Sequence, residues 1–269
     1  MNILYKYCDQ LGIVKILGAL ELKLPYISEV NDPLECLPFI YCSNNKAAMK
    51  AQILRTFNRN DISQIVDWEQ KIDEVIKTGM LQKKLEDDLR EYIYDYIRKG
   101  LLLSVSQEAR STVMWAHYAD KHKGAIIGID FDRIFPKYRI KMNEVTYSKQ
   151  RPKMDVLDDS EKEENFGKTL ITKSDEWTYE KEFRVIFGDA YLMDLERQGL
   201  ACLKDFNGKK TWFLRLNPES IKEIIFGLYT EESLKLAIRK LTEQSELQHI
   251  KLYQAKESET YILNLVEIK

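Results

Sequence analysis

The stretch WTYEKEFRVIF (residues 177–187) sets apolar and charged side chains in alternation. Successive side chains of a β-strand point to opposite faces of a sheet. A strand here would direct Glu180, Glu182 and Arg184 to one face, and to the other face an apolar set: Trp177, Tyr179, Phe183, Val185 and Phe187. We predict a strand over this stretch. Its charged row is either a solvated structural ion ladder or the lining of a functional site.

The sequence on both sides of this strand predicts further strands. NILYKY (2–7), LLLSVS (101–106) and AIIGIDF (125–131) are rich in β-branched and apolar residues, and the last third contains similar runs. Residues 45–100 instead carry apolar side chains at helical spacing, which predicts an insertion of two or three helices ending at Gly100. Strands that flank helices in this way favour an α+β fold over a doubly wound sheet.

We therefore predict an α+β fold in which a mixed, mainly antiparallel sheet or sheets form a split core, with a helical insertion and flanking helices. Residues 1–269 are expected to form a single domain, with 45–100 inserted into it. Ser111 is predicted to cap a helix that runs through TVMWAHYADKHKG and stops at Gly124.

The composition argues against several classes of protein. Of the 269 residues, 44% are hydrophobic and 31% charged, and the formal charge of −2 predicts no general attraction to nucleic acid or anionic membranes. No apolar run approaches the ~18 residues of a membrane span and no signal peptide is recognisable, so we expect a cytoplasmic protein without membrane association. Four cysteines at irregular spacing and three histidines predict neither a disulfide framework nor a zinc module.

Several motifs resemble those of the bacterial family known as domain of unknown function 2971. They are the N-terminal Tyr-Lys-Tyr strand, the Asn-Asp-Pro turn at 31–33, the Met-Trp-Ala-His-Tyr helix at 114–118 and the Trp-Thr-Tyr-Glu-Lys-Glu-Phe-Arg strand at 177–184. The resemblance covers most of the chain. Because the family name implies no activity, the chemistry has to be argued from residues.

More distantly, the chain resembles the ADP-ribosyltransferase superfamily, whose members break the nicotinamide–ribose bond of NAD. One branch of that superfamily has a basic residue on its first strand, a serine-containing strand in the middle and a late Glu-x-Glu pair. This chain has Lys6, then Ser104 with Ser106, then Glu180 with Glu182 in the same order. It departs from the pattern in having Lys instead of Arg or His, and Ser-Val-Ser instead of Ser-Thr-Ser.

This resemblance implies that NAD is the substrate and that ADP-ribose passes to a macromolecular acceptor, protein or nucleic acid, or to water. Glu182 would stabilise the oxocarbenium-like centre, and Glu180 would orient or deprotonate the acceptor. Lys6 would hold a phosphate. The full set of cofactor-binding candidates is Tyr5, Lys6, Ser104, Ser106, His117, Tyr118 and Arg184. A toxin or a phage-defence effector is the setting that we expect for such an activity.

Two other functions stay open. Aromatic and basic residues in RTFNR (55–59), RKG (98–100) and KHKG (121–124) would suit a non-catalytic module that binds nucleic acid or a partner protein. Alternatively, a metal-dependent nuclease could use four carboxylates, because hard divalent cations prefer oxygen ligands. These are Asp32, Glu35, Glu180 and Glu182.

Overall fold

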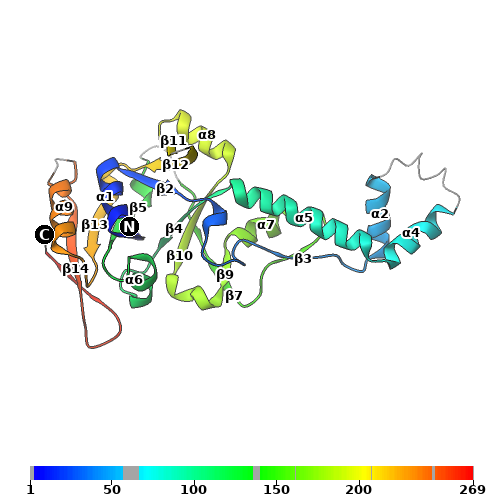
Figure 1. The fold of residues 1–269 in the computed structure, drawn as a ribbon, viewed down its shortest axis with the longest axis horizontal. Coiled ribbons are helices and arrows are strands. Elements are labelled where there is room, and N and C mark those ends of the chain that lie inside the picture. Colours follow the sequence, from blue (N-terminus) through cyan, green and yellow to red (C-terminus); the bar gives the residue numbers. More distant parts are fainter. Residues whose placement is uncertain are drawn as a thin grey trace. The chain divides into compact units, whose positions relative to one another are not determined.

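The computed structural model describes residues 3–56, 67–135, 140–160, 162–206, 208–243 and 246–268. Backbone contacts divide the chain into two compact units. The first unit combines Met1–Glu29, Gly100–Tyr147 and Asp175–Lys269, and the second combines Val30–Lys99 and Ser148–Ser174. Each unit is therefore assembled from segments far apart in the sequence, which Figure 1 traces by colour.

A mixed sheet forms the centre of the first unit. Its eight strands, counted within the described residues, follow the order β15-β14-β13-β5-β1-β4-β10-β6. Neighbouring strands are antiparallel, except that β13 and β14 are parallel. The strands are β1 (Ile3–Cys8), β4 (Leu101–Ser106), β5 (Ala125–Asp130), β6 (Asn143–Glu144), β10 (Glu182–Phe187), β13 (Ile221–Phe226), β14 (Lys251–Lys256) and β15 (Asn264–Glu267). The predicted α+β class with a mainly antiparallel sheet is confirmed.

This sheet is divided between β1 and β4. β1 pairs with β5 through all six of its residues, and β4 pairs with β10 in the same complete way. β1 and β4, in contrast, share the single pair Tyr5 and Ser106. The two central strands therefore diverge on either side of that pair. The predicted split of the core corresponds to this divergence of β1 and β4.

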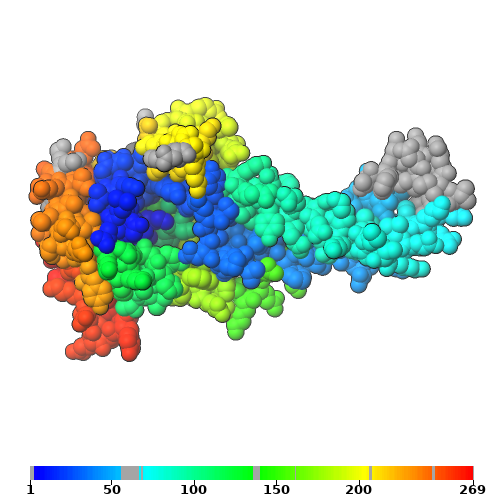
Figure 2. All heavy atoms as spheres, viewed as in Figure 1, coloured from blue at the N-terminus to red at the C-terminus, as the bar shows by residue number. Residues whose placement is uncertain are grey.

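The main hydrophobic core lies on one face of the sheet. There the sheet packs against helices and against a second sheet of order β11-β12-β2. Figures 1 and 2 show two of these helices, α1 and α9, side by side. The covering elements are α1 (Gln10–Ala19), α8 (Asp189–Arg197), α9 (Glu232–Thr242), β2 (Glu21–Leu24), β11 (Ala201–Phe206) and β12 (Lys209–Arg215). The short 3-10 turns of this unit are η1 (Ile27–Glu29), η2 (Phe131–Arg133), η3 (Asp175–Glu180) and η4 (Pro218–Ser220).

Helix α6 (Thr112–Tyr118) builds a smaller core on the opposite face, where Trp115 is fully buried against Tyr7. Ser111 caps this helix as predicted, because its side chain accepts a hydrogen bond from the Met114 N–H. The predicted cap is thus reproduced.

The end of α6 differs from the prediction. The helix stops at Tyr118, because Asp120, Lys121 and His122 all have positive φ angles and form a left-handed turn. Gly124 is needed for another reason than capping. A Cβ atom at Gly124 would lie 2.0 Å from the carbonyl oxygen of Cys8, so only glycine fits.

The strand predicted over 177–187 is also shorter than expected. Asp175–Glu180 form the 3-10 helix η3, and β10 begins only at Glu182. Between them, Lys181 has a φ of 43°, and its N–H donates to the carbonyl of Thr178. This turn removes residues 177–181 from the alternating pattern, so the strand prediction was wrong there and correct for 182–187.

The second unit contains α2 (Lys46–Thr56), α4 (Trp68–Lys77) and α5 (Met80–Lys99), which agree with the predicted helices in 45–100; residues 57–66 lie outside the described part. It also holds a parallel two-stranded ribbon of β3 (Phe39–Tyr41) and β8 (Lys153–Asp155). The remaining elements are α7 (Lys162–Leu170), β9 (Thr172–Ser174) and, at a boundary between the two units' segments, β7 (Thr146–Ser148). None of the described helices is both long and apolar enough to cross a membrane.

Candidate functional site

A row of polar side chains crosses three neighbouring strands on the face of the sheet that carries α6. In the register of β4 and β10, Ser106 lies opposite Glu182, and Ser104 lies opposite Arg184. In the register of β1 and β4, Tyr5 lies opposite Ser106. Directly paired residues of an antiparallel sheet point to the same face. The structure therefore brings five of the predicted site residues together.

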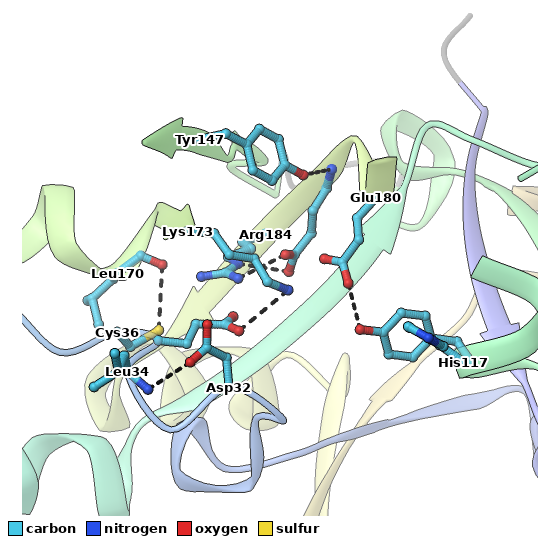
Figure 3. A network of polar contacts seen from close by, with 12 residues as sticks. Asp32, Leu34, Cys36, His117, Tyr147, Leu170, Lys173, Glu180 and Arg184 are labelled. Atoms are coloured by element: carbon cyan, nitrogen blue, oxygen red, sulfur yellow. Dashed lines mark hydrogen bonds and ion pairs between the residues drawn. The ribbon is translucent and has the colours of Figure 1, made fainter. Parts of the chain in front are cut away.

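Arg184 and Glu182 form a buried ion pair within this row. Arg184 is fully buried, and Glu182 is 4% exposed. The guanidinium is bidentate: Nε donates to Oε1 at 2.7 Å and Nη2 donates to Oε2 at 2.8 Å. The N–H of Glu182 donates to the Tyr147 hydroxyl at 2.8 Å, a contact drawn in Figure 3. The charged row is thus an ion pair, as one alternative proposed, but it is buried instead of solvated.

Glu180 lies at the end of η3, outside the strand, and is only 3% exposed. Its carboxylate Oε1 accepts a hydrogen bond from the Tyr118 hydroxyl at 2.5 Å. Its backbone carbonyl accepts another from Ser106 Oγ, also at 2.5 Å. In Figure 3, Glu180 points toward α6, the helix that carries His117. Residues of α6 and β4 therefore hold this carboxylate in place.

The backbone between the two glutamates is held by Glu108. The Lys181 ammonium pairs with the Glu108 carboxylate at 2.9 Å, and the Lys181 carbonyl accepts the N–H of Gln107. Burial alone would raise the pKa of Glu108, but hydrogen bonds from Lys181 and from the Arg110 N–H hold that pKa below its usual value. A left-handed non-glycine residue costs roughly 1–2 kcal/mol. These contacts offset that cost at Lys181.

Lys6 lies on the opposite face of the sheet from this row. Its neighbours on that face, Leu4 and Cys8, belong to the main core. The Lys6 ammonium donates to the carbonyl of Ser104 at 3.0 Å, where β1 and β4 have diverged. Burial lowers the pKa of this ammonium. The structure thus places the Lys6 side chain between the diverging strands, where its ammonium contacts the Ser104 backbone and the Glu182 charge partly opposes the effect of burial on its pKa.

Tyr5 connects the row to a residue that the sequence did not single out. Its hydroxyl donates to Oε1 of Glu223, on β13, at 2.9 Å. Gly128 lies between them in the sheet, and a Cβ there would come within 2.7 Å of the Glu223 side chain. Burial raises the pKa of Tyr5, and the Glu223 charge adds to the shift. Only the pairing of β13 with β5, and of β5 with β1, reveals Glu223.

His117 belongs to an aromatic group beside Glu180. The Tyr179 hydroxyl lies 3.3 Å from His117 Nδ1, and the rings of Tyr118, Trp177 and Tyr179 lie 5.9–6.4 Å from the imidazole. Trp177 and Tyr179 were predicted on the face opposite the glutamates. They are found here because η3 replaces the first part of the predicted strand.

The four carboxylates of the nuclease alternative come from two different units. In the second unit, Asp32 accepts the N–H of Leu34 at 2.8 Å, and Glu35 pairs with Lys173 at 3.4 Å; Figure 3 labels Asp32, Leu34 and Lys173. Across the ranges that the structure describes, no group of three or more His, Cys, Asp or Glu side chains could hold a metal ion. The nuclease alternative stays a prediction.

Sequence reasoning missed three residues that shape the site besides Glu223. Tyr147 binds the backbone of Glu182, while Glu108 and Lys181 fix the turn between the glutamates. Tyr147 lies in a short strand-like run, Thr-Tyr-Ser, which was the only available signal. Glu108 and Lys181 gave none, because an ion pair across a turn depends on the tertiary structure.

Part of the site lies in a segment that matches a family model. Residues 114–185 match the model of a family described as protein of unknown function (DUF2971). The matched segment begins within α6 and ends within β10, so it contains Tyr118, Glu180, Glu182 and Arg184. The serine strand β4 and the first strand lie outside it. No curated protein and no solved structure matched the chain. The resemblance to ADP-ribosyltransferases stays a prediction.

Proposed function

We propose that the chain cleaves the nicotinamide–ribose bond of NAD and transfers ADP-ribose to water or to a macromolecular acceptor, as a toxin or phage-defence effector would. The observation that carries this proposal is the pairing of Ser106 with Glu182 across β4 and β10, with the buried Glu180 next to both. The first strand, the serine strand and the glutamate strand are also neighbours in the sheet, in that order. This adjacency supports the order of residues on which the resemblance rests.

Burial of the charged residues supports a functional role. Glu180, Glu182 and Arg184 are each at most 4% exposed. Burying an ion pair costs several kcal/mol per ion in lost hydration, and well-packed apolar residues in its place are often equally stable or more stable. Stability alone therefore gives no reason to keep three charged side chains here. A binding or catalytic role does.

The chemistry assigns a role to each carboxylate. When the C–N bond breaks, its electron pair leaves with nicotinamide, whose ring becomes neutral, and positive charge develops on the ribose. Glu182 would stabilise that charge, with Arg184 fixing its orientation while reducing the negative charge that it presents. Glu180 would take the proton of the attacking water or acceptor hydroxyl. Tyr118 would orient Glu180 through their hydrogen bond.

Release of nicotinamide from NAD, followed by chromatography, tests the proposal. Glu180→Gln keeps the size of the side chain and an acceptor for Tyr118 but removes the charge. We expect it to slow release by at least about a hundredfold, the scale of general-base catalysis. Glu182→Gln is expected to have an effect of similar size. Glu176→Gln is the matched control, because Glu176 is exposed on the same 3-10 helix, and it should keep the wild-type rate.

The reactions are run with NAD alone and with cell lysate as a source of acceptors. Thermal melting of each variant separates loss of activity from loss of folding, which matters most for Glu182→Gln because Glu182 holds Arg184. Absence of nicotinamide release by the wild-type chain in both settings would refute the proposal. So would an equal loss of rate in Glu176→Gln and Glu180→Gln.

A further inference from the structure

The second unit carries two exposed, stacked aromatic rings on its parallel ribbon. Phe39 and Tyr41 are 48% and 36% exposed, and they share a face because they are two residues apart on β3. Their ring centroids lie 6.4 Å apart, with an angle of 24° between the planes. Met154, on the other face of the ribbon, is 3% exposed. One face of the ribbon is therefore buried, and the other presents a preformed aromatic surface.

Two cations lie beside Phe39, one of the two rings. The guanidinium carbon of Arg151 lies 5.9 Å from the ring centroid of Phe39. Lys153 lies opposite Phe39 in the register of β3 and β8, so it shares the aromatic face. Lys149, two residues before Arg151, is exposed as well. Within the described ranges, none of these three cations has a carboxylate partner.

The nearby carboxylates are already engaged by backbone amides. Asp155, at the end of β8, accepts the N–H groups of Ser43 and Leu157 at 3.2 and 3.1 Å. Glu86, on α5, accepts the N–H of Cys42 at 3.0 Å. These acids therefore satisfy the backbone next to the ribbon. Asp155 lies opposite Tyr41 and keeps its negative charge, so the positive charge lies at the Phe39 end of the ribbon, where an anionic partner can meet it.

We propose that this face of the ribbon binds single-stranded nucleic acid. Its members, which we call the aromatic ribbon, are Phe39, Tyr41, Arg151 and Lys153. Exposed aromatic rings stack on unpaired bases, and neighbouring cations neutralise the phosphates, a combination that tolerates many sequences. An acidic protein would match the cations but not the stacked rings. The proposal does not depend on NAD chemistry, which uses residues of the first unit.

Binding of labelled dT20 and U20 oligonucleotides by the full chain, measured by fluorescence anisotropy, tests the proposal for DNA and for RNA. Phe39→Leu/Tyr41→Leu keeps apolar side chains but removes both rings. It should raise the dissociation constant at least tenfold, because each base stacked on an aromatic ring contributes about 1–3 kcal/mol and 1.4 kcal/mol is a factor of ten. Arg151→Gln/Lys153→Gln should reduce the slope of log K against log salt by about 1.4, since each phosphate contact with a single strand contributes about 0.7.

The control combines Tyr92→Leu with Lys84→Gln. Both residues are exposed on α5 in the same unit, so this variant removes a ring and a cation without touching the aromatic ribbon. It should bind as the wild-type chain does. The proposal is overturned if neither oligonucleotide binds, if the control loses as much affinity as the double leucine variant, or if the charge variant keeps the wild-type salt slope. Circular dichroism of all variants checks that the unit stays folded.

Discussion

The buried charge of Arg184 depends on Glu182. Its guanidinium is fully buried and forms a bidentate ion pair with the Glu182 carboxylate. Glu182→Leu should lower the free energy of unfolding by about 3–5 kcal/mol, since it leaves a buried charge without that partner. Glu182→Leu/Arg184→Met removes both charges and should recover much of the loss, as apolar replacements of buried ion pairs often do. Urea denaturation of the wild type, both single variants and the double variant measures this coupling.

Independent residues give losses that add within about 0.5 kcal/mol. Additivity of the Glu182 and Arg184 variants to that extent would show that the two side chains are not coupled, against the expectation. At this scale the sequence was informative, because alternation alone put Glu182 and Arg184 on one face of a strand. It said nothing of Tyr147 or Glu223, whose contacts depend on strand pairing.

The left-handed turn after α6 contains a titratable side chain. Its last residue, His122, stacks on Trp115 with ring centroids 6.2 Å apart, and burial lowers the pKa of the imidazole. The unfolded chain therefore binds a proton that the folded chain resists, so folding stability should fall as the pH drops below about 6.5. A single titratable group changes the free energy of unfolding by at most about 1.4 kcal/mol per pH unit.

His122→Asn isolates this effect, because asparagine accepts a left-handed backbone and does not titrate. Urea midpoints measured at about pH 7.5 and pH 5.5 should differ less in this variant than in the wild type. An equal difference in both proteins would assign the pH dependence to other groups. The variant also loses the ring that stacks on Trp115, so the comparison is between pH values within each protein.

The elements show where sequence patterns mislead. β1, β4 and β5 could be predicted because their residues have strand character along their whole length. The strand prediction was wrong at residues 177–180 because these residues fit two structures. They alternate as a strand does, but Trp177 and Glu180 are also three residues apart, the spacing of one 3-10 turn. The turn at 120–122 gave no signal, because it contains no glycine. Tertiary contacts hold this turn in place. One of them is the hydrogen bond that the Tyr229 N–H donates to the His122 carbonyl at 3.0 Å.

Across the whole molecule, the register of the sheet was the missing information. Ser106 and Glu182 come from distant parts of the chain, and only the pairing of β4 with β10 puts them side by side. Period-two patterns give the faces of each strand but leave its partner and register open. The pairing of β1 with β4 puts Tyr5 on the face of Ser106, and Lys6 starts from the other face because successive residues of a strand alternate.

Hydrogen exchange followed by mass spectrometry examines both proposals in one molecule. β5 is buried at every residue and paired on both sides, so its amides should exchange most slowly, whereas the two-stranded ribbon of β3 and β8 should exchange faster. Addition of NAD should slow exchange in residues 101–108 and 175–187, which carry the serine and glutamate row. Addition of dT20 should slow exchange in residues 38–42 and 151–156 instead. Protection of residues 175–187 by the oligonucleotide, with exchange in the ribbon unchanged, would contradict the assignment of nucleic acid to the ribbon. A lack of any protection by NAD would count against the assignment of NAD to the first unit.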